Sequence, residues 1–265
     1  MLYYNDNPVS IDHFPDGTIL MKQEVGLSCA HRITWKFENN EELVALIYLV
    51  SHIRSKSNLP VTLDLPYVPN ARQDRVKNPE DVFTLKWFAQ TINALKFDSV
   101  CITDPHSSVA EALFDHVCIK RADDLIQESL EIVVGKSGGT PVLMFYPDEG
   151  AMKRYSGAVN MPYAFGIKKR DWRTGQIHGL DVAGATYLID GHNILMVDDI
   201  CSRGGTFTHS ARKLKELGAD KIYLYVTHCE DTIFQGSVLT DGLIEEVFTT
   251  DSILTKTHEK IEVIT

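Results

Sequence analysis

Strand-like runs, each followed by a loop and a helix-like pattern, recur along the chain and restrict its fold more than any other feature. LPVTLDLPYV precedes DVFTLKWFAQTINAL, and FDSVCITDPH precedes SVAEALFDHV. The order continues with TPVLMFYPDEG, with HNILMVDDICSRGG before FTHSARKLKELGA, and with KIYLYVTH. This alternation predicts parallel α/β layers rather than a sandwich or a helix bundle. Ligands of such sheets bind at the carboxyl ends of the strands.

Local chemistry supports two of the predicted helices. ENNEELVALIYLVSHIRSKSNLP reads as a long amphipathic helix, because its acidic first turn suits the positive end of the helix dipole, and Arg54 and Lys56 suit the negative end. In KELGADKIYLYVTH, Gly218 is predicted to take the left-handed conformation that closes a helix before the next strand begins.

The length of 265 residues allows two domains of about 100–150 residues, each with its own core. One large domain is the competing prediction. Two halves rich in strand–helix units meet near residues 118–125. We therefore predict an N-terminal domain over 1–120 and a C-terminal domain over 121–265.

The composition narrows the class of protein. Apolar residues make up 44% of the chain, and no apolar run reaches about 18 residues, so we expect a cytoplasmic protein with no membrane partner. The net charge of −10 argues against non-specific binding of nucleic acid, which needs a broad basic surface. The five cysteines lack C-x-x-C spacing and are predicted to be reduced thiols; they are Cys29, Cys101, Cys118, Cys201 and Cys229.

MVDDICSRGGT is the segment that most strongly predicts a binding site. A strand ending in Asp198 and Asp199 runs into a turn of small residues and then a helix. Backbone N–H groups of such a turn bind phosphate, while the carboxylates bind ribose hydroxyls or a hydrated cation. The predicted loop residues are Ser202, Arg203, Gly204, Gly205 and Thr206.

This segment resembles the ribose-phosphate-binding loop of type I phosphoribosyltransferases and of ribose-phosphate diphosphokinases. LPYVPNARQDR, residues 65–75, resembles the ATP-binding signature of the diphosphokinases, which phosphoribosyltransferases lack. The resemblance implies an α/β fold of two tandem type I phosphoribosyltransferase-like domains, each a mainly parallel sheet flanked by helices. It also implies ATP contacts from Arg72, Gln73, Asp74 and Arg75.

Two further segments resemble the parts of the family that bind magnesium and pyrophosphate. TDPHSSVAEALFDHV places His106 where the family has a magnesium-site histidine, although magnesium by itself prefers oxygen ligands. FYPDEGAMKRYSGA resembles the pyrophosphate loop, in which Asp148 is the second magnesium residue and Glu149 and Gly150 follow. Glu149 is a departure, since the family usually has a small or apolar residue there.

Two other segments match the family in part. FGIKKRDWRTGQIHG lies where the diphosphokinases have a mobile catalytic loop, and its Lys168 and Arg170 match the family's catalytic Lys-x-Arg pair. DHFPDGTI resembles a segment that contacts the adenine from a neighbouring subunit, with Phe14 and Asp16 in place. For the chain as a whole we expect a homo-oligomer built from dimers. A simple turn around Pro15 and Gly17 explains the same segment equally well.

The phosphate loop departs from the family's D-T-[AGC]-G-T pattern, because Arg203 adds a charged fork. A second phosphate on the acceptor is one explanation, and it makes ADP-ribose, with a possible role in NAD synthesis, the alternative to ribose 5-phosphate. In the other explanation, Arg203 contacts the same phosphate or points to solvent. The chain is also shorter than typical members before the ENNEELVALI helix and after KIEVI.

The resemblance therefore implies an ATP-dependent diphosphokinase with Mg²⁺ as cofactor, which transfers diphosphate from ATP to a ribose 5-phosphate acceptor. A phosphoribosyltransferase and a non-catalytic regulator related to the synthetases are the rival hypotheses. ARQDR argues against the first, and the presence of His106, Asp148, Lys168 and Arg170 argues against the second.

Overall fold

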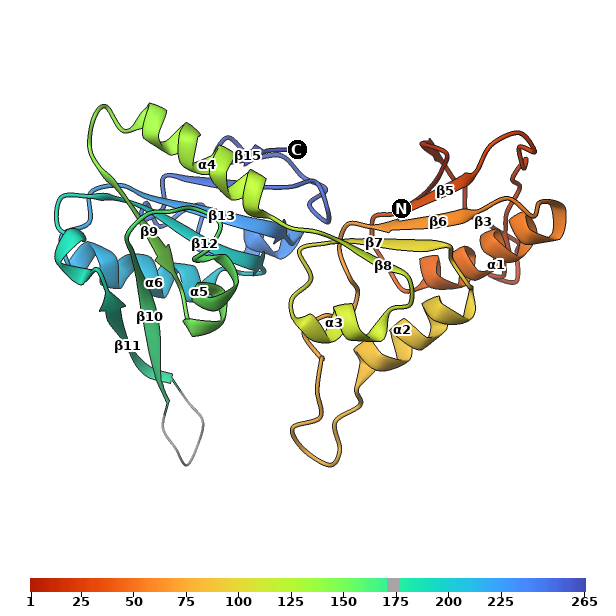
Figure 1. Cartoon of the computed structure of the whole chain (residues 1–265), viewed down its shortest axis with the longest axis horizontal. Helices are drawn as coiled ribbons and strands as arrows, with labels where there is room; N and C mark the ends of the chain where they lie inside the picture. Colours follow the sequence, from red (N-terminus) through yellow and green to blue (C-terminus); the bar gives the residue numbers. More distant parts are fainter. Residues whose placement is uncertain (171–176) are drawn as a thin grey trace. The chain divides into compact units, whose positions relative to one another are not determined.

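The structure is a computed structural model that describes residues 1–170 and 177–265, with the side chains of 168–170, 177 and 178 outside the description. The chain divides into two compact units, unit 1 over Met1–Arg121 and unit 2 over Ala122–Thr265 (Figure 1). Each unit has its own sheet and its own helices. No helix of the described chain is both long and apolar enough to cross a membrane.

Unit 1 is built on a six-stranded sheet in the order β2-β1-β5-β6-β7-β8. The strands β5 to β8 are parallel, and β1 and β2 add an antiparallel edge. A separate antiparallel pair, β3 and β4, lies between β2 and β5 in the sequence. The strands are β1 (Leu2–Tyr4), β2 (Asn7–Pro8), β3 (Asp12–His13), β4 (Ile19–Leu20), β5 (His31–Trp35), β6 (Val61–Leu65), β7 (Ser99–Thr103) and β8 (Val117–Lys120).

The three helices of unit 1 pack on one face of this sheet (Figure 1). They are α1 (Glu41–Lys56), α2 (Thr84–Ala94) and α3 (Ser108–Leu113). Side chains of β6 and β7 alternate accordingly: Leu63 and Val100 are buried beneath the helices, whereas Asp64 and Cys101 on the opposite face are only half-buried. This alternation is typical of a sheet with one covered face.

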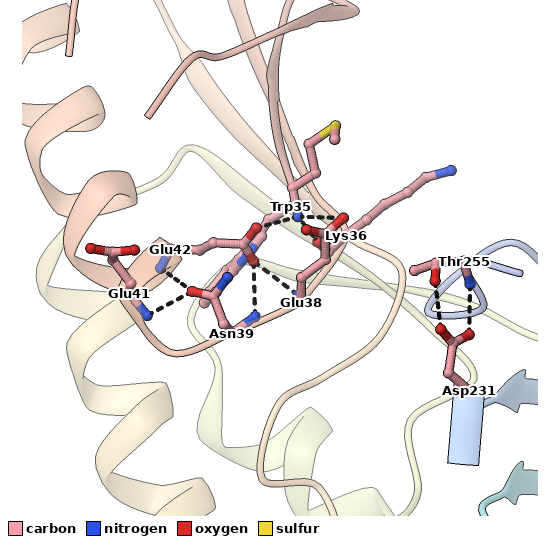
Figure 2. Close-up of polar contacts among 9 residues, drawn as sticks. Trp35, Lys36, Glu38, Asn39, Glu41, Glu42, Asp231 and Thr255 are labelled. Atoms are coloured by element: carbon pink, nitrogen blue, oxygen red, sulfur yellow. Dashed lines mark hydrogen bonds and ion pairs between the residues drawn. The ribbon is translucent and has the colours of Figure 1, made fainter. Parts of the chain in front are cut away.

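The start of α1 is fastened by two polar side chains (Figure 2). Asn39 Oδ1 accepts from the backbone N–H groups of Glu41 and Glu42 at 3.0 and 3.3 Å, which satisfies donors that a helix start leaves open. The carboxylate of Glu42 is 3% exposed and accepts from Trp35 Nε1 at 2.8 Å and from the N–H of Glu38 at 2.9 Å. These bonds tie the helix to strand β5.

Figure 2 also shows a side chain of unit 2 that accepts a backbone hydrogen bond: Asp231 accepts from the N–H of Thr255 at 3.0 Å.

Unit 2 contains a seven-stranded sheet in the order β11-β10-β9-β12-β13-β14-β15. All neighbouring strands are parallel except β10 and β11, which form an antiparallel hairpin. The strands are β9 (Val142–Tyr146), β10 (Tyr163–Arg170), β11 (Ile177–Gly184), β12 (Asn193–Cys201), β13 (Ile222–Cys229), β14 (Glu246–Thr249) and β15 (Ile261–Val263).

Helices cover both faces of the unit 2 sheet, so every residue of β9 and β13 is buried. The cluster under α4 contains Met144, Leu195 and Tyr225, and the cluster under α6 contains Phe145 and Leu224. The helices are α4 (Asp123–Lys136), α5 (Glu149–Tyr155) and α6 (Gly205–Glu216), with short 3₁₀ helices η1 (Thr186–Leu188) and η2 (Asp231–Gln235).

The predicted fold class of two mainly parallel sheets flanked by helices is confirmed. The predicted helix end is confirmed as well, because Gly218 has a φ of +91° two residues after α6 ends. Helix α4 was not predicted. One expectation was wrong: the basic segment 165–179 was expected to be a loop, but residues up to Arg170 and from Ile177 onward belong to the β10–β11 hairpin.

Candidate active site

Strand β12 delivers two acidic side chains to the carboxyl end of the unit 2 sheet. Asp199 is 5% exposed, and its backbone N–H donates to Asp198 Oδ1 at 2.9 Å. Burial raises the pKa of Asp198 well above its usual range, and the negative charges of Asp199 and Asp148 raise it further. Carboxylates concentrated in this way favour ligands that donate hydrogen bonds or carry positive charge.

The turn after β12 requires a glycine at its centre. Gly204 has a φ of +73° and caps α6, and a Cβ at this position would collide with the side chain of Val238. The turn leads directly into α6, where Gly205 and Thr206 in the first turn of the helix are exposed. A helix start of this kind suits an anion.

Arg203 projects from the same turn and is exposed. Its Nη2 donates to Gln235 Oε1, on η2, at 3.3 Å, and its backbone carbonyl approaches Gly236 so closely that a Cβ there would collide with it. The arginine is therefore oriented by η2 and does not simply point into solvent.

Asp148 lies at the end of β9, the neighbour of β12 in the sheet. It is the N-cap of α5, and its Oδ1 accepts from the N–H of Ala151 at 3.1 Å. Glu149 is exposed and forms an ion pair with Lys153 at 3.5 Å, and Gly150 is exposed in the first turn of α5. The predicted pyrophosphate segment is therefore a helix start beside the two aspartates of β12.

Arg154 is a candidate site residue that the sequence predictions missed. Its Nη1 lies 3.2 Å from Asp199 Oδ2, and its guanidinium lies 4.8 Å from the centre of the Tyr155 ring. The signal in the sequence is weak, because an arginine near the end of a short helix is most often only solvated. Its contact with Asp199 joins residues that are far apart in the chain.

The predicted catalytic pair lies on the hairpin at the edge of the unit 2 sheet. The backbones of Lys168 and Arg170 belong to β10, where Lys168 is the register partner of Leu180 on β11. Their side chains lie outside the described residues, as does Arg173. Their roles therefore remain predictions.

In unit 1, the ARQDR segment follows β6 and contains a buried carboxylate. Asp74 is 5% exposed and accepts from Arg75 Nε at 2.7 Å and Nη2 at 2.8 Å. The Arg75 guanidinium lowers the pKa of Asp74 to about 2, with Ser107 and the charge of His106 adding to the effect. Asp74 therefore links this segment to the loop after β7, which carries His106.

Arg72 and Gln73 of ARQDR are exposed, whereas Ala71 is buried. Gln73 Oε1 accepts from Thr84 Oγ1 at 2.7 Å, at the start of α2, and Arg72 is exposed beside it. His106 is half-buried.

The segment around Phe14 forms the β3–β4 turn. The N–H of Gly17 donates to Phe14 O at 2.9 Å, and Asp16 Oδ1 accepts from the N–H of Thr18 at 3.0 Å and from its hydroxyl at 2.7 Å. These bonds lower the pKa of Asp16. Asp16 thus has a structural role in the turn, whereas Phe14 is 49% exposed and presents its ring to solvent.

The acidic residues of unit 2 fit magnesium by their chemistry. Magnesium in proteins is commonly held by one or two carboxylates together with substrate phosphates. The described residues contain no group of three or more His, Cys, Asp or Glu side chains placed to hold a metal. Asp148 and Asp198 lie close enough for the charge of Asp148 to affect Asp198, so these two carboxyl groups are the ones that would hold a cation here.

The two sheets, with their strand-end loops, define an α/β protein of two phosphoribosyltransferase-like units. A family model described as phosphoribosyl synthetase-associated domain matches residues 179–264. The chain is 29% identical to a ribose-phosphate pyrophosphokinase of Bradyrhizobium diazoefficiens over 223 residues, which cover 82% of this chain and 68% of that protein. It is 28% identical to the Thermococcus kodakarensis ribose-phosphate pyrophosphokinase over 90% of this chain and 81% of that protein.

A solved structure agrees in fold. The phosphoribosylpyrophosphate synthetase from Mycobacterium smegmatis matches with a TM-score of 0.80 at 20% sequence identity, covering 97% of this chain and 85% of the other. The chain is thus similar to ribose-phosphate pyrophosphokinases over most of its length. The alternative acceptor considered above, ADP-ribose, has no support in these comparisons, and neither has a role in NAD synthesis.

Proposed function

We propose that the protein transfers the β,γ-diphosphate of ATP to the anomeric 1-hydroxyl of ribose 5-phosphate, giving phosphoribosyl pyrophosphate and AMP. One observation carries this proposal. Relatives named ribose-phosphate pyrophosphokinase match 81–95% of the chain, so the similarity includes both units. A phosphoribosyltransferase would account for only one unit and would not explain ARQDR.

In this proposal unit 2 binds the acceptor. The turn from Ser202 to Thr206 binds the 5-phosphate through its backbone N–H groups and the Arg203 guanidinium. Asp198 and Asp199 accept hydrogen bonds from the ribose hydroxyls. The ion pair of Asp199 with Arg154 supports this role, because it orients the buried carboxylate of Asp199.

Unit 1 binds ATP in the same proposal. Arg72 contacts the polyphosphate, Gln73 reads the adenine edge, and Asp74 holds Arg75 and the His106 loop in position. The 2.7 and 2.8 Å contacts between Asp74 and Arg75 support a positioning role for Asp74 rather than direct contact with ATP. Phe14 and Asp16 are assigned to the adenine of another subunit, which requires an oligomer that sedimentation can measure.

In this reaction the side chains mainly align the substrates and offset negative charge. The anomeric hydroxyl loses its proton to solvent as its oxygen attacks the β-phosphorus. The bond from that phosphorus to the α-phosphate oxygen breaks, and AMP leaves with the oxygen. Lys168 and Arg170 offset the negative charge that shifts onto the departing AMP. Asp148 and His106 are assigned to Mg²⁺, which when bound neutralises phosphate charge.

The test measures AMP release from Mg-ATP by purified full-length protein. We expect AMP release that depends on ribose 5-phosphate and a product labelled with the β- and γ-phosphorus of ATP. Parallel reactions contain ADP-ribose or no acceptor. Absence of acceptor-dependent AMP release would rule out the proposed kinase activity. Preference for ADP-ribose would show that the acceptor is ADP-ribose and that the reaction type is as proposed.

Lys168 is tested separately in the same assay. Lys168→Ala is expected to lower kcat by about 100-fold or more, because it removes a charge that acts on the transition state. The matched control is Lys213→Ala, since Lys213 only pairs with Glu216 on the surface of α6. Equal turnover in both variants would remove Lys168 from the mechanism.

A further inference from the structure

Two cysteines of unit 1 face each other across neighbouring strands. Cys101 on β7 and Cys118 on β8 are register partners in the parallel pair. Neighbouring strands lie about 4.8 Å apart, within the range of Cα separations that a disulfide spans. The two thiols are close enough to share a hydrogen bond, which contributes to the raised pKa of Cys101.

Both thiols lie on the sheet face that α1, α2 and α3 leave open. Val100 and Ile102 on β7 point into the core beneath these helices, so Cys101 points the opposite way. Cys118 is exposed, and β8 is the last strand of the sheet. A dissolved reagent therefore reaches Cys118 without any opening of the fold.

The other cysteines provide internal comparisons. Cys201 and Cys229 are also register partners, on β12 and β13, but both are 0% exposed in the core of unit 2. Their mutual hydrogen bond and burial raise the pKa of Cys201. Cys29 is exposed in unit 1 and has no such register partner among the strands of the described chain. The chain thus holds an accessible pair, a buried pair and a single accessible thiol.

We propose that Cys101 and Cys118 are a reactive dithiol that takes up a small-molecule disulfide oxidant and closes to a reversible disulfide between β7 and β8. This site is independent of the proposed diphosphokinase chemistry. It lies on the strand that leads into Asp104 and His106, so the bond fastens the base of that loop to the edge of the sheet.

The reaction with glutathione disulfide balances in two exchanges. The Cys118 thiolate attacks one sulfur of glutathione disulfide, forming a mixed disulfide and releasing one glutathione thiolate. The Cys101 thiol then loses its proton to solvent, and its sulfur attacks the Cys118 sulfur. The second glutathione leaves as a thiolate and takes up a proton. Two protein thiols are oxidised, and one glutathione disulfide is reduced to two glutathione thiols.

The environment of Cys101 suits the second exchange rather than the first. Burial, Cys118 and Asp64 raise the pKa of Cys101, whereas Lys120 on β8 lowers it. Cys101 is therefore less readily ionised than an ordinary thiol, and the closeness of the Cys118 sulfur offsets this in the second exchange. Cys118 is the thiol that meets the oxidant first.

The experiment treats full-length Cys29→Ser protein with glutathione disulfide at neutral pH and analyses it by intact mass and peptide mapping. The substitution removes the single accessible thiol and the dimers it would form. We expect a loss of two hydrogens, one peptide link between Cys101 and Cys118, no retained glutathione, and recovery of the thiols with dithiothreitol. Adding Cys101→Ser should trap glutathione on Cys118, and adding Cys118→Ser should slow oxidation by at least about tenfold.

Several outcomes overturn the proposal. They are glutathione that stays on Cys118 while Cys101 is present, a disulfide between Cys201 and Cys229 under the same conditions, and no reaction at all. Circular dichroism of each variant confirms that the thiols compared belong to folded protein. The closed disulfide in folded Cys29→Ser protein is the result that supports it.

Discussion

Arg154 on α5 lies with its Nη1 3.2 Å from Oδ2 of Asp199 at the end of β12. Asp199 is 5% exposed, whereas the side chain of Arg154 is 26% exposed. The helix that follows the predicted diphosphate segment is therefore tied to the strand that carries the predicted ribose site.

Arg154→Met should weaken both stability and acceptor binding. Loss of the guanidinium leaves a buried carboxylate with less compensation, and we expect unit 2 to lose about 1–3 kcal/mol of unfolding free energy. Urea unfolding measures the change. The neighbouring Lys153→Met is the control, because its pair with Glu149 is exposed and contributes about 0–1 kcal/mol. Equal effects of the two substitutions would contradict the role given to Arg154.

Asp198→Asn should stabilise the protein while removing activity. The pKa of Asp198 is raised in the folded state, so the folded protein binds this proton more tightly than the unfolded chain, and stability falls as pH rises from the unfolded to the folded pKa. Above that window the neutral asparagine avoids the cost, and it keeps the acceptor for the N–H of Asp199. Thermal unfolding at neutral pH should show a gain of about 1 kcal/mol. A loss of stability would show that ionised Asp198 is well compensated.

Asp74→Asn should change the acid stability of unit 1. The folded pKa of Asp74 is about 2, below the unfolded value of 3.8, so its stabilisation is present above the unfolded pKa and is lost as pH falls towards 2. Because Arg75 is exposed, we expect only about 1–2 kcal/mol at neutral pH. Urea unfolding from neutral pH to pH 2 measures the difference between the two proteins. In the Arg75→Ala background the difference should shrink, and an unchanged difference would rule out Arg75 as its cause.

Arg203→Ala should raise KM for ribose 5-phosphate by about tenfold with a smaller change in kcat, because it removes one charged contact to a phosphate distant from the reacting atoms. Gln235→Ala is the comparison, since Gln235 orients Arg203 without carrying its charge. Its effect on KM should be smaller and in the same direction. A normal KM in Arg203→Ala would mean that backbone groups hold the phosphate alone.

Local sequence patterns predicted the helices and strands that can be recognised from the spacing of their own residues or from the residue that ends them. The alternation of strands and helices and the position of Gly218 depend on neighbours in the sequence, and both are confirmed. Helix α4 also carries such a signal, since Ile126, Leu130 and Val133 repeat at helical spacing and are buried. Its absence from the prediction was therefore an omission rather than a limit of the sequence.

The β10–β11 hairpin and the ion pair of Arg154 are features that the sequence alone could not predict. Consecutive cations at the end of β10 resemble a solvated loop, and only pairing with β11 makes the segment a strand. Likewise, Asp199 meets Arg154 because β12 lies beside β9, the strand that leads into α5. Such contacts depend on which strands become neighbours, and spacing along the chain does not contain that information.

Helices cover both faces of the unit 2 sheet, and this cover limits how often the hydrogen bonds between its strands open. Amide protons exchange slowly where strands are shielded on both faces and paired on both edges, as β12 is between β9 and β13. The candidate phosphate turn therefore begins on one of the strands with the slowest expected exchange and ends in the exposed first turn of α6. A ligand at this turn meets a rigid base, and most of the ordering that binding requires has already taken place on folding.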